Sequence, residues 1–510
     1  MDVEPRLAAV VEIGSTGIRL LVAEISPSGQ WKILDRAGKP VALGRDVFTS
    51  GQVSRESFME CLSVLRNFRE CLKGWGLSDK DVHVIATSAL RAARNRDLFA
   101  DRVRQETGFT LSVVEGIEEN RLMYLAVRFA LKNDIPLFWR ANSMILETGG
   151  GSTEIMLLRR GQMVAAHSLR LGTLLIGHSS SFASPSSRER YLNENLRNTS
   201  EFLSDELDLA YVRLFVVAGS DARIAAAVCG RELNENCRVI NREDFIAFAE
   251  SIQNYTVEEC IEKLQISYAE AEGLVPGILI YKFLLERTGA AQLVVPQVSI
   301  REGLLIDLAQ GVDPLMQEEF FSQITASACS LGRKYHFDEA HSRQVARLCM
   351  ILFDALAKEH GMERRERMML EAAALLHDVG MFIRASGHHL HGQYIVANSE
   401  IFGLHHDELN IIANVIRYHR GDPPSQQDID YIALQREDRV LVLKMTALLR
   451  VADALDRGHS RQIRDIEVEK RSDTLVIRSS GSRDLSLERI GLDHKAGLFQ
   501  EVFGYKVVLN

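Results

Sequence analysis

The sequence predicts an α/β protein of two similar lobes, followed by an all-α domain and a small α+β C-terminal domain. Strands alternate with helices up to about residue 310, and two parts of this stretch open with the same strand–turn–strand pattern. From about 315 to 457 the apolar periodicity is almost wholly helical, and strands return only after 458. The expected domains are therefore residues 1–133, 134–310, 311–457 and 458–510.

In the first lobe, residues 8–25 read as two apolar strands around a Gly-Ser-Thr-Gly turn, which predicts a β-hairpin. Residues 54–73 place apolar side chains at helical spacing, with Ser54 as the N-cap. Further strands are expected at 82–86 and 111–114, and further helices from residue 87 and over 118–131.

The second lobe repeats this opening. A strand at 143–147 is followed by Thr-Gly-Gly-Gly-Ser-Thr-Glu and by a strand at 155–158. A strand at 214–217 then leads through Gly219 and Ser220 into a helix at 222–228. In the C-terminal domain, strands are expected at 466–468, 475–477 and 505–509.

Composition excludes several classes of protein. Hydrophobic residues make up 46% of the 510 residues and charged residues 25%, the mix of ordinary globular proteins. The net charge of −9 excludes a general attraction to nucleic acid, so a polyanionic ligand requires a local basic pocket. The seven cysteines form no CxxC pair, the start lacks a signal-peptide pattern, and no apolar run approaches ~18 residues. We expect a cytoplasmic protein that binds neither a membrane nor a nucleic acid polymer.

The two glycine-rich turns are candidate phosphate-binding loops. Glycine lets backbone N–H groups approach an anion, because no Cβ blocks the way. One such turn is more often structural, but each of these two follows a carboxylate, Glu12 or Glu147, at the same offset. Two facing loops would bind phosphates across one cleft, where the carboxylates hold Mg²⁺ (or Mn²⁺) or orient a water molecule. The hydroxyl donors of the loops are Ser15, Thr16, Ser152 and Thr153.

The pair Glu118-Glu119 lies at the start of a predicted helix. Carboxylates in a first helical turn are stabilised by the helix dipole, and this structural role is the ordinary one. Beside bound phosphate, one of them would instead be a general base that activates water for in-line attack. Arg91 and Arg94, at another helix start, either add positive charge to the site or remain solvated.

Six segments, taken in order, resemble the exopolyphosphatase/guanosine pentaphosphate phosphohydrolase (Ppx/GppA) family over about residues 8–308. The Glu-Glu-Asn-Arg-Leu and Arg-Glu-Gly-Leu motifs select this family, whereas the glycine segment would match any actin-like ATPase. The resemblance implies an actin-like (sugar kinase/Hsp70-like) double lobe, the long four-domain form of the family, and a homodimer. The segments are residues 9–16, 86–95, 114–122, 147–154, 168–173 and 298–305.

By this resemblance Glu119 matches the catalytic glutamate. The implied reaction is Mg²⁺-dependent release of terminal orthophosphate from inorganic polyphosphate, or of the 5′ γ-phosphate of pppGpp. The chain departs from the family's usual Asp-hydrophobic-Gly-Ser-Asn-Ser loop at Glu12, Thr16 and Gly17, and it has Glu147 in place of a second Asp. Both loop carboxylates are one methylene longer, and a ~1 Å displacement at a reacting centre can cost ~10²-fold in rate. The expected phosphate-binding residues are Gly14, Ser15, Thr16, Arg91, Gly149, Gly150, Gly151, Ser152, Thr153, Gly219 and Ser220.

A second candidate site lies in the helical domain, since eleven of the 15 histidines fall between residues 336 and 459. A helix expected over 372–381 carries His377 and Asp378 in an apolar surrounding and would end at Gly380. With a core-facing His and Asp on two other helices, the set resembles the metal ligands of the HD phosphohydrolase superfamily. The alternative is a core in which these residues pair with one another and hold no metal. The implied ligands are His341, His377, Asp378 and Asp453, with His391 and His419 as further candidates.

These observations favour a phosphohydrolase in the cleft between the lobes, with Glu119 activating water and Glu12 and Glu147 holding Mg²⁺. An alternative places a metal-dependent nucleotide phosphohydrolase in the HD-type domain, with the lobes sensing polyphosphate or guanosine penta/tetraphosphate. A third is a non-enzymatic regulator that binds polyanions. A kinase is less favoured, because no separate adenosine-pocket signal is evident. Long polyphosphate would also need a basic channel beyond the cleft.

Overall fold

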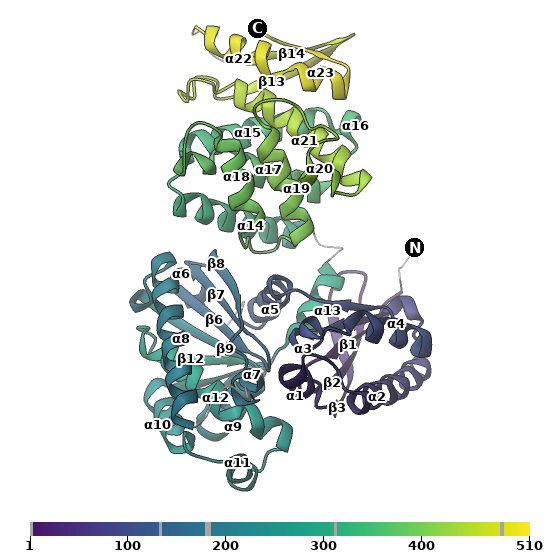
Figure 1. Ribbon diagram of the computed structural model, residues 1–510, viewed down its shortest axis with the longest axis vertical. Coiled ribbons are helices and arrows are strands. Elements are labelled where there is room, and N and C mark those ends of the chain that lie inside the picture. The colour runs from purple at the N-terminus through teal and green to yellow at the C-terminus, as the bar shows by residue number, and fades with distance from the viewer. Residues whose placement is uncertain (1–3, 132–134, 179–184, 311–313, 480–483) are drawn as a thin grey trace. The chain divides into compact units, whose positions relative to one another are not determined.

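The computed structural model describes residues 4–131, 135–178, 185–310, 314–479 and 484–510 (Figure 1). The chain divides into two compact units, residues 1–320 and 321–510. The predicted domain boundaries at 133/134 and 310/311 fall on the segments 132–134 and 311–313, which lie outside the described residues. In the part of the chain that the structure describes, no helix is long and apolar enough to cross a lipid bilayer.

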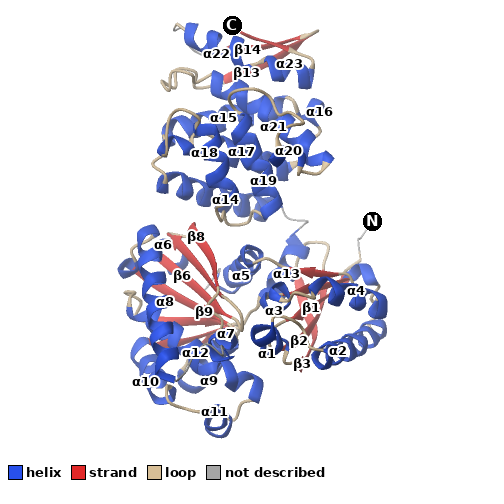
Figure 2. Cartoon of the chain, in the orientation of Figure 1, coloured by secondary structure: helices blue, strands red, loops and turns tan. Residues whose placement is uncertain are grey.

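The first lobe is built on one five-stranded sheet (Figure 2). Its strands are β1 (Arg6–Ile13), β2 (Gly17–Ile25), β3 (Trp31–Pro40), β4 (Val82–Ala86) and β5 (Leu111–Val113). The order is β3-β2-β1-β4-β5. β1 and β2 form the expected hairpin, with Ile13 opposite Ile18 at its turn, and β4 and β5 continue the sheet in parallel with β1. The third antiparallel strand, β3, was not among the predicted strands.

Three helices of this lobe begin close to where the sequence predicts them: α2 (Arg55–Gly74), α3 (Ser88–Ala92) and α5 (Gly116–Leu131). The other two, α1 (Leu43–Ser50) and α4 (Arg96–Thr107), were not among the predicted helices. The backbone N–H of Ser57 donates to the side chain of Ser54 at 3.2 Å, which confirms Ser54 as the N-cap of α2. Buried residues of α2, among them Leu65 and Phe68, share one apolar core with Val84 of β4.

The second lobe repeats the topology of the first. Its strands are β6 (Asn142–Thr148), β7 (Thr153–Arg159), β8 (Gln162–Leu169), β9 (Val212–Ala218), β10 (Arg231–Asn234), β11 (Cys237–Asn241) and β12 (Gln292–Pro296). The order is β10-β11-β12-β9-β6-β7-β8. The run β8-β7-β6-β9-β12 matches β3-β2-β1-β4-β5, so the internal duplication expected from the sequence is present, and β10 and β11 add a hairpin at one edge.

One helix that follows the second sheet in the chain, α13, packs against the sheet of the first lobe. The helices that come after the first lobe in this unit are α6 (Leu137–Arg140), α7 (Thr173–His178), α8 (Pro185–Glu206), α9 (Ser220–Cys229), α10 (Arg242–Ile252), α11 (Val257–Leu264), α12 (Tyr268–Glu286) and α13 (Ile300–Gln310). In α13, Leu305 and Ala309 pack against Ala8 and Leu21 of the first sheet. A Cβ at Gly303 would lie 2.0 Å from the carbonyl oxygen of Leu122, so glycine permits the close approach of α13 to α5.

The second unit begins as a helical bundle and ends in a small sheet. Its helices up to residue 454 are the C-terminal part of α14 (Pro314–Lys334), α15 (Glu339–Ala355), α16 (Ala357–His360), α17 (Arg364–Leu376), α18 (His388–Ala397), α19 (His406–Tyr418), α20 (Ile429–Ile432) and α21 (Arg436–Ala454). The predicted strands are present as β13 (Ile466–Arg471), β14 (Thr474–Ser479) and β15 (Lys506–Leu509). Between β14 and β15, α22 (Ser486–Lys495) and α23 (Gly497–Phe503) pack against α21.

Candidate functional site

Both glycine loops of the first unit line the same cavity, of about 110 Å³. β1 and β2 present the first loop, and β6 and β7 present the second, so the duplicated hairpins bring the loops together. The cavity also receives Glu119 from the first turn of α5. The predicted site residues among its lining are Glu12, Gly14, Ser15, Thr16, Glu119, Glu147, Gly149, Gly150, Ser152, Gly219 and Ser220.

The two loops are closed in the same way and touch each other. The backbone N–H of Gly14 donates to the carbonyl of Gly17 at 3.0 Å, and that of Gly149 to the carbonyl of Ser152 at 2.8 Å. A Cβ at Gly150 would lie 2.7 Å from the Cβ of Ser15, so the loops can meet only because this position is glycine. The site is therefore assembled by contact between the lobes.

Burial perturbs the acidic side chains of the cavity. It raises the pKa of Glu119, against the opposing charge and hydrogen bond of Arg91. Burial, together with the charges of Glu119 and Glu12, raises the pKa of Glu147 to about 8. Glu154 accepts from Ser168 Oγ at 2.9 Å, and burial raises its pKa well above the usual range. These carboxylates crowd one small volume, which favours the arrival of a cation.

Three arginines line the same cavity, and the sequence reasoning named none of them. They are Arg19 on β2, Arg223 on α9 and Arg301 on α13. The guanidinium Nε of Arg301 lies 3.1 Å from Glu12 Oε2. Burial lowers the pKa of Arg223, and the charges of Arg19 and Arg301 contribute to the decrease. Three guanidinium groups that line one cavity favour an anion between them.

Signals for these arginines exist in the sequence. Arg301 stands in the Arg-Glu-Gly-Leu motif that selected the family, and Arg223 comes three residues after Ser220. Arg19 follows the first loop directly, two residues after Gly17. The acidic residues Glu154 and Asp221, which also line the cavity, were missed as well.

Three predicted phosphate-binding residues do not line the cavity within the described part of the chain. The Nη1 atom of Arg91 contacts Glu119 Oε1 and donates to the carbonyl of Val114 at 2.7 Å, so Arg91 orients the glutamate. The Oγ1 of Thr153 donates to the carbonyl of Leu171 at 2.6 Å. Gly151 faces Phe48, whose Cζ would lie 2.3 Å from an added Cβ.

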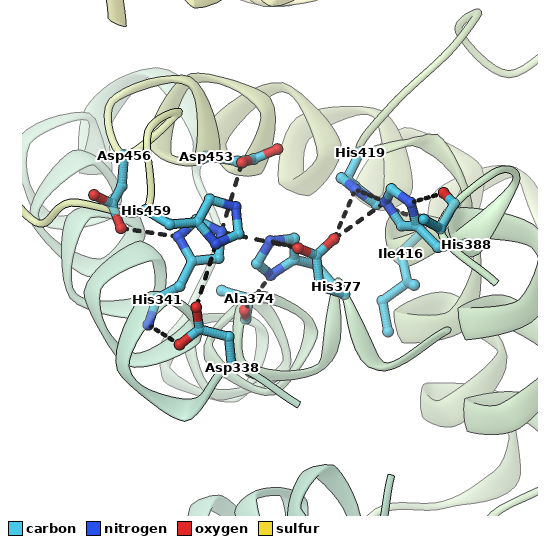
Figure 3. A network of polar contacts seen from close by, with 12 residues as sticks. Asp338, His341, Ala374, His377, His388, Ile416, His419, Asp453, Asp456 and His459 are labelled. Carbon is cyan, nitrogen blue, oxygen red and sulfur yellow. Dashed lines mark hydrogen bonds and ion pairs between the residues drawn. The ribbon is translucent and has the colours of Figure 1, made fainter. Parts of the chain in front are cut away.

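In the second unit, the four predicted metal ligands lie close together in one cluster, and Figure 3 shows three of them, His341, His377 and Asp453, side by side. His341 lies on α15, His377 and Asp378 follow α17, and Asp453 lies near the end of α21. The Nε2 of His341 is 3.9 Å from Asp453 Oδ1 and 4.0 Å from Asp378 Oδ2. The Nε2 of His377 is 3.6 Å from Asp378 Oδ2. Ligand atoms of His341, His377 and Asp453 all lie within 4.8 Å of one another.

The imidazole rings are oriented from outside the cluster. The Nδ1 of His377 lies 2.8 Å from the carbonyl oxygen of Ala374, and the Nδ1 of His341 lies 2.8 Å from Asp456 Oδ2 (Figure 3). The Nε2 atoms of both histidines are buried and have no hydrogen-bond partner among the described residues. Leaving a buried polar atom unpaired is costly. Inward-facing Nε2 atoms beside carboxylates, each imidazole held through Nδ1, are the donor types that divalent metal ions prefer.

A further group of ligand atoms lies on the other side of Asp378. Its Oδ1 is 3.1 Å from His388 Nε2 and 3.7 Å from His419 Nε2. His419 was a candidate from the sequence, whereas His388 was not. The structure brings His388, and not the candidate His391, into the groups of ligand atoms found among the described residues. Burial lowers the pKa of His419 to about 3, with the charge of His377 adding to the effect, so its ring is neutral as metal coordination requires.

The helix that leads to Asp378 does not end where the sequence predicts. α17 stops at Leu376, a 3₁₀ turn covers Val379–Phe382, and Gly380 does not have the positive φ of a helix-ending glycine. A Cβ at Gly380 would instead lie 2.0 Å from the carbonyl oxygen of His388. Gly380 is therefore needed for the close approach of α18, which carries His388 to the cluster.

The C-terminal segment contributes a cation to this cluster. Lys495, the last residue of α22, is buried, and its Nζ contacts Asp453 Oδ2. Asp453 thus has one oxygen on the lysine and the other facing His341. Burial alone would raise the pKa of Asp453, but Lys495 and the neighbouring histidines hold it well below its usual range.

The duplicated sheet order and the two facing glycine loops define a two-lobed protein of the actin-like class with a cleft between the lobes. The sequence comparisons make the class specific. The Ppx/GppA phosphatase family matches residues 21–311, and Ppx/GppA phosphatase, domain III, matches residues 325–490. The chain belongs to the Ppx/GppA phosphatase family.

Curated relatives and solved structures agree with this assignment. A guanosine-5′-triphosphate,3′-diphosphate pyrophosphatase of Pseudoalteromonas atlantica is 23% identical over 466 residues, covering 88% of this chain and 85% of its own. A protein of the same name from Aliivibrio fischeri is 22% identical over 450 residues, with 86% of each covered. The crystal structure of an exopolyphosphatase from Cytophaga hutchinsonii, 20% identical, matches with a TM-score of 0.54 over 60% of this chain and 99% of that chain. The last comparison shows the fold of the first unit.

Proposed function

We propose that this chain is a phosphohydrolase that releases terminal orthophosphate from inorganic polyphosphate, or the 5′ γ-phosphate of pppGpp, in the cleft between its two lobes. The observation that carries the proposal is one cavity lined by both glycine loops, Glu119 and three arginines. The relatives are named for hydrolysis of guanosine pentaphosphate, and a protein with the fold of the first unit is named an exopolyphosphatase.

Glu119 is the proposed general base. Burial raises its pKa above that of an exposed glutamate, which favours proton uptake from an attacking water. Arg91 holds the carboxylate by its contact with Glu119 Oε1, which leaves the other carboxylate oxygen free to face the cleft. This role makes Arg91 a positioning residue.

The loops and the arginines bind the phosphate chain. Backbone N–H groups and the hydroxyls of Ser15 and Ser152 supply neutral donors, and Arg19, Arg223 and Arg301 supply positive charge. Glu12 and Glu147 would hold Mg²⁺ or Mn²⁺, since carboxylate oxygens are the ligands these ions prefer. When bound, the ion would neutralise phosphate oxygens and the leaving group. The charge on the transferred group is thus met from both lobes.

The test is phosphate release from pppGpp and from long-chain polyphosphate with Mg²⁺. Glu119→Gln keeps the size of the side chain and removes the base, so we expect a loss of about 10²-fold or more in kcat. The matched control is Glu118→Gln, because Glu118 pairs with Arg121 at 2.7 Å and does not line the cavity. Equal activity of the two variants would contradict the assignment of Glu119.

We also propose that the second unit holds a divalent metal ion at His341, His377, Asp378 and Asp453, as in an HD-type domain. The inward-facing Nε2 atoms of His341 and His377 favour this over a paired core, because they have no hydrogen-bond partner among the described residues. The alternative function, a metal-dependent nucleotide phosphohydrolase in this unit, rests on the same atoms. Calorimetric titration with Mn²⁺ tests the metal site. We expect wild type to bind Mn²⁺ and His377→Ala to bind it at least tenfold more weakly.

Two further expectations from the family resemblance stay predictions. Homodimerisation is tested by light scattering of the purified chain, where a mass near twice 57.2 kDa is expected. The domain limits 1–133, 134–310, 311–457 and 458–510 are tested by limited proteolysis, which cleaves first at exposed connections.

A further inference from the structure

The second unit contains a cavity of about 460 Å³ that includes none of the ligands of the proposed metal site. Its walls come from α18, α19, α20 and the first turn of α21, all within the helical bundle. The volume falls in the range of roughly 300–1,000 Å³ that sites for small molecules span. The reaction proposed for the first unit makes no use of this cavity.

The charged side chains of the cavity are all acidic. Asp407, Asp430 and Asp438 line it, one each from α19, α20 and α21, and the described residues of its wall include no lysine, arginine or histidine. The Oδ2 of Asp430 accepts from Gln393 Nε2 at 3.0 Å, which is a neutral partner.

Two of these carboxylates are close enough to repel each other. Asp407 and Asp438 lie in first helical turns, where the helix dipole ordinarily stabilises a carboxylate. Burial nevertheless raises the pKa of Asp438, and the charge of Asp407 adds to the increase. A cation in the cavity would relieve this repulsion.

An unpaired amide oxygen is a second and independent sign of a ligand. Asn414 of α19 lines the cavity, and only 3% of this residue is exposed. Its Nδ2 donates to the carbonyl of Asn410 at 2.9 Å within the same helix. Its Oδ1 is buried and has no hydrogen-bond partner among the described residues, which is a costly arrangement. A ligand that donates a hydrogen bond would satisfy this oxygen.

The rest of the wall suits an organic cation better than a hydrated metal ion. Ala397, Ala413 and Leu434 present apolar side chains to the same space, where methylene groups can replace water. Tyr394, which is 69% exposed, adds an aromatic ring, and the face of such a ring attracts an ammonium group. Ammonium groups only donate hydrogen bonds, whereas carboxylates and amide oxygens accept them. Carboxylates on three separate helices match a ligand whose cationic centres are separated by methylene spacers.

We propose that this cavity binds a linear polyamine, with its ammonium groups at Asp407, Asp430, Asp438 and the amide oxygen of Asn414, and its methylene groups against the apolar wall. The site lies outside both the proposed phosphate cleft and the proposed metal site, so it does not depend on the proposed function. A ligand here would connect α18 with α21, the helices that carry His388 and Asp453 of the cluster. Because it binds the folded unit, it is expected to raise the Tm of that unit.

The experiment is calorimetric titration of the full chain with spermidine at low ionic strength. The variant Asp430→Asn/Asp438→Asn keeps the size of both side chains and removes two of the three charges, so we expect it to bind spermidine at least tenfold more weakly than wild type. Neither aspartate is buried, so the variant is expected to fold, which its Tm without ligand checks. The matched control is Asp493→Asn, which makes the same kind of charge change at an exposed residue of α22 outside the cavity and is expected to bind like wild type.

A second titration separates an organic cation from charge alone. Hexaamminecobalt(III) carries the same charge as spermidine and has no methylene groups, so we expect it to bind wild type at least fivefold more weakly. Equal affinity for the two cations would overturn the assignment to a polyamine. Failure of wild type to bind spermidine, or equal affinity of wild type and Asp430→Asn/Asp438→Asn, would overturn the site itself.

Discussion

Replacing Lys495 with methionine is expected to make the stability of residues 321–510 depend on a divalent metal ion. The ion pair between Lys495 and Asp453 is buried, with 7% and 6% of the two residues exposed. Removing one partner of a buried pair costs about 3–5 kcal/mol, because the remaining charge is left uncompensated. For a unit of this size each kcal/mol shifts Tm by about 2–4 °C. The variant in EDTA is therefore expected to melt about 6–20 °C below wild type.

Differential scanning calorimetry of the full chain, in EDTA and in Mn²⁺, measures this effect. Mn²⁺ at the cluster would replace the positive charge of Lys495 beside Asp453. The ion is therefore expected to bring the Tm of the variant most of the way back to that of wild type. The control is Lys470→Met, which breaks a more exposed pair with Glu359 and is expected to cost about 1 kcal/mol or less. An equal loss of Tm in EDTA and in Mn²⁺ would show that Lys495 acts through packing alone and would refute the reasoning.

Three further variants test other parts of the account. Gly150→Ala would place a Cβ 2.7 Å from that of Ser15, so we expect the loops to separate and phosphate release to fall at least tenfold; wild-type rates would contradict the contact between the lobes. Glu147, with its pKa raised to about 8, keeps a proton that the unfolded chain loses above about pH 4.5, so stability in EDTA falls as pH rises from 5 to 8. Glu147→Gln is expected to flatten this dependence of stability on pH. The same change of Tm with pH in wild type and in Glu147→Gln would argue against the raised pKa. His388→Ala is expected to weaken Mn²⁺ binding at least fivefold while His391→Ala does not, and the opposite order would contradict the observed cluster.

Much of the fold could be predicted because local patterns determine it. Alternating or continuous apolar runs bounded by turn residues located β1, β2, β4, β6 and β7, and the Ser54 cap located the start of α2. The repeated hairpin was enough to predict a duplicated lobe. β3 was missed because its residues are mostly exposed and only Trp31 and Ile33, at its start, show apolar alternation.

The parts that escaped prediction depend on contacts between distant segments. α13 follows the second lobe in the chain but packs on the first sheet, which only the tertiary structure shows. Arg301 enters the cleft as a result of that packing. Similarly, His388 and His391 are both near the start of α18, and the close approach at Gly380 decides which ring reaches Asp378. Lys495 lies 42 residues beyond Asp453, and no periodicity links them.

The glutamates at the two loop positions have a physical context in the structure. Glu12 contacts Arg301, and Glu147 shares a crowded volume with Glu119. The two longer side chains thus lie next to charged groups, an arginine for Glu12 and a glutamate for Glu147. Restoring the shorter residue with Glu12→Asp would lengthen the contact with Arg301 and is expected to change KM for Mg²⁺, as steady-state rates over a range of Mg²⁺ concentrations would show.

The most direct test of the central claim is phosphate release from pppGpp and long-chain polyphosphate by wild type, Glu119→Gln and His377→Ala, each with Mg²⁺ or Mn²⁺. If the cleft between the lobes performs the reaction, Glu119→Gln loses about 10²-fold or more in rate and His377→Ala retains the wild-type rate. Loss of activity in His377→Ala with full activity in Glu119→Gln would move the reaction to the helical unit and contradict the account.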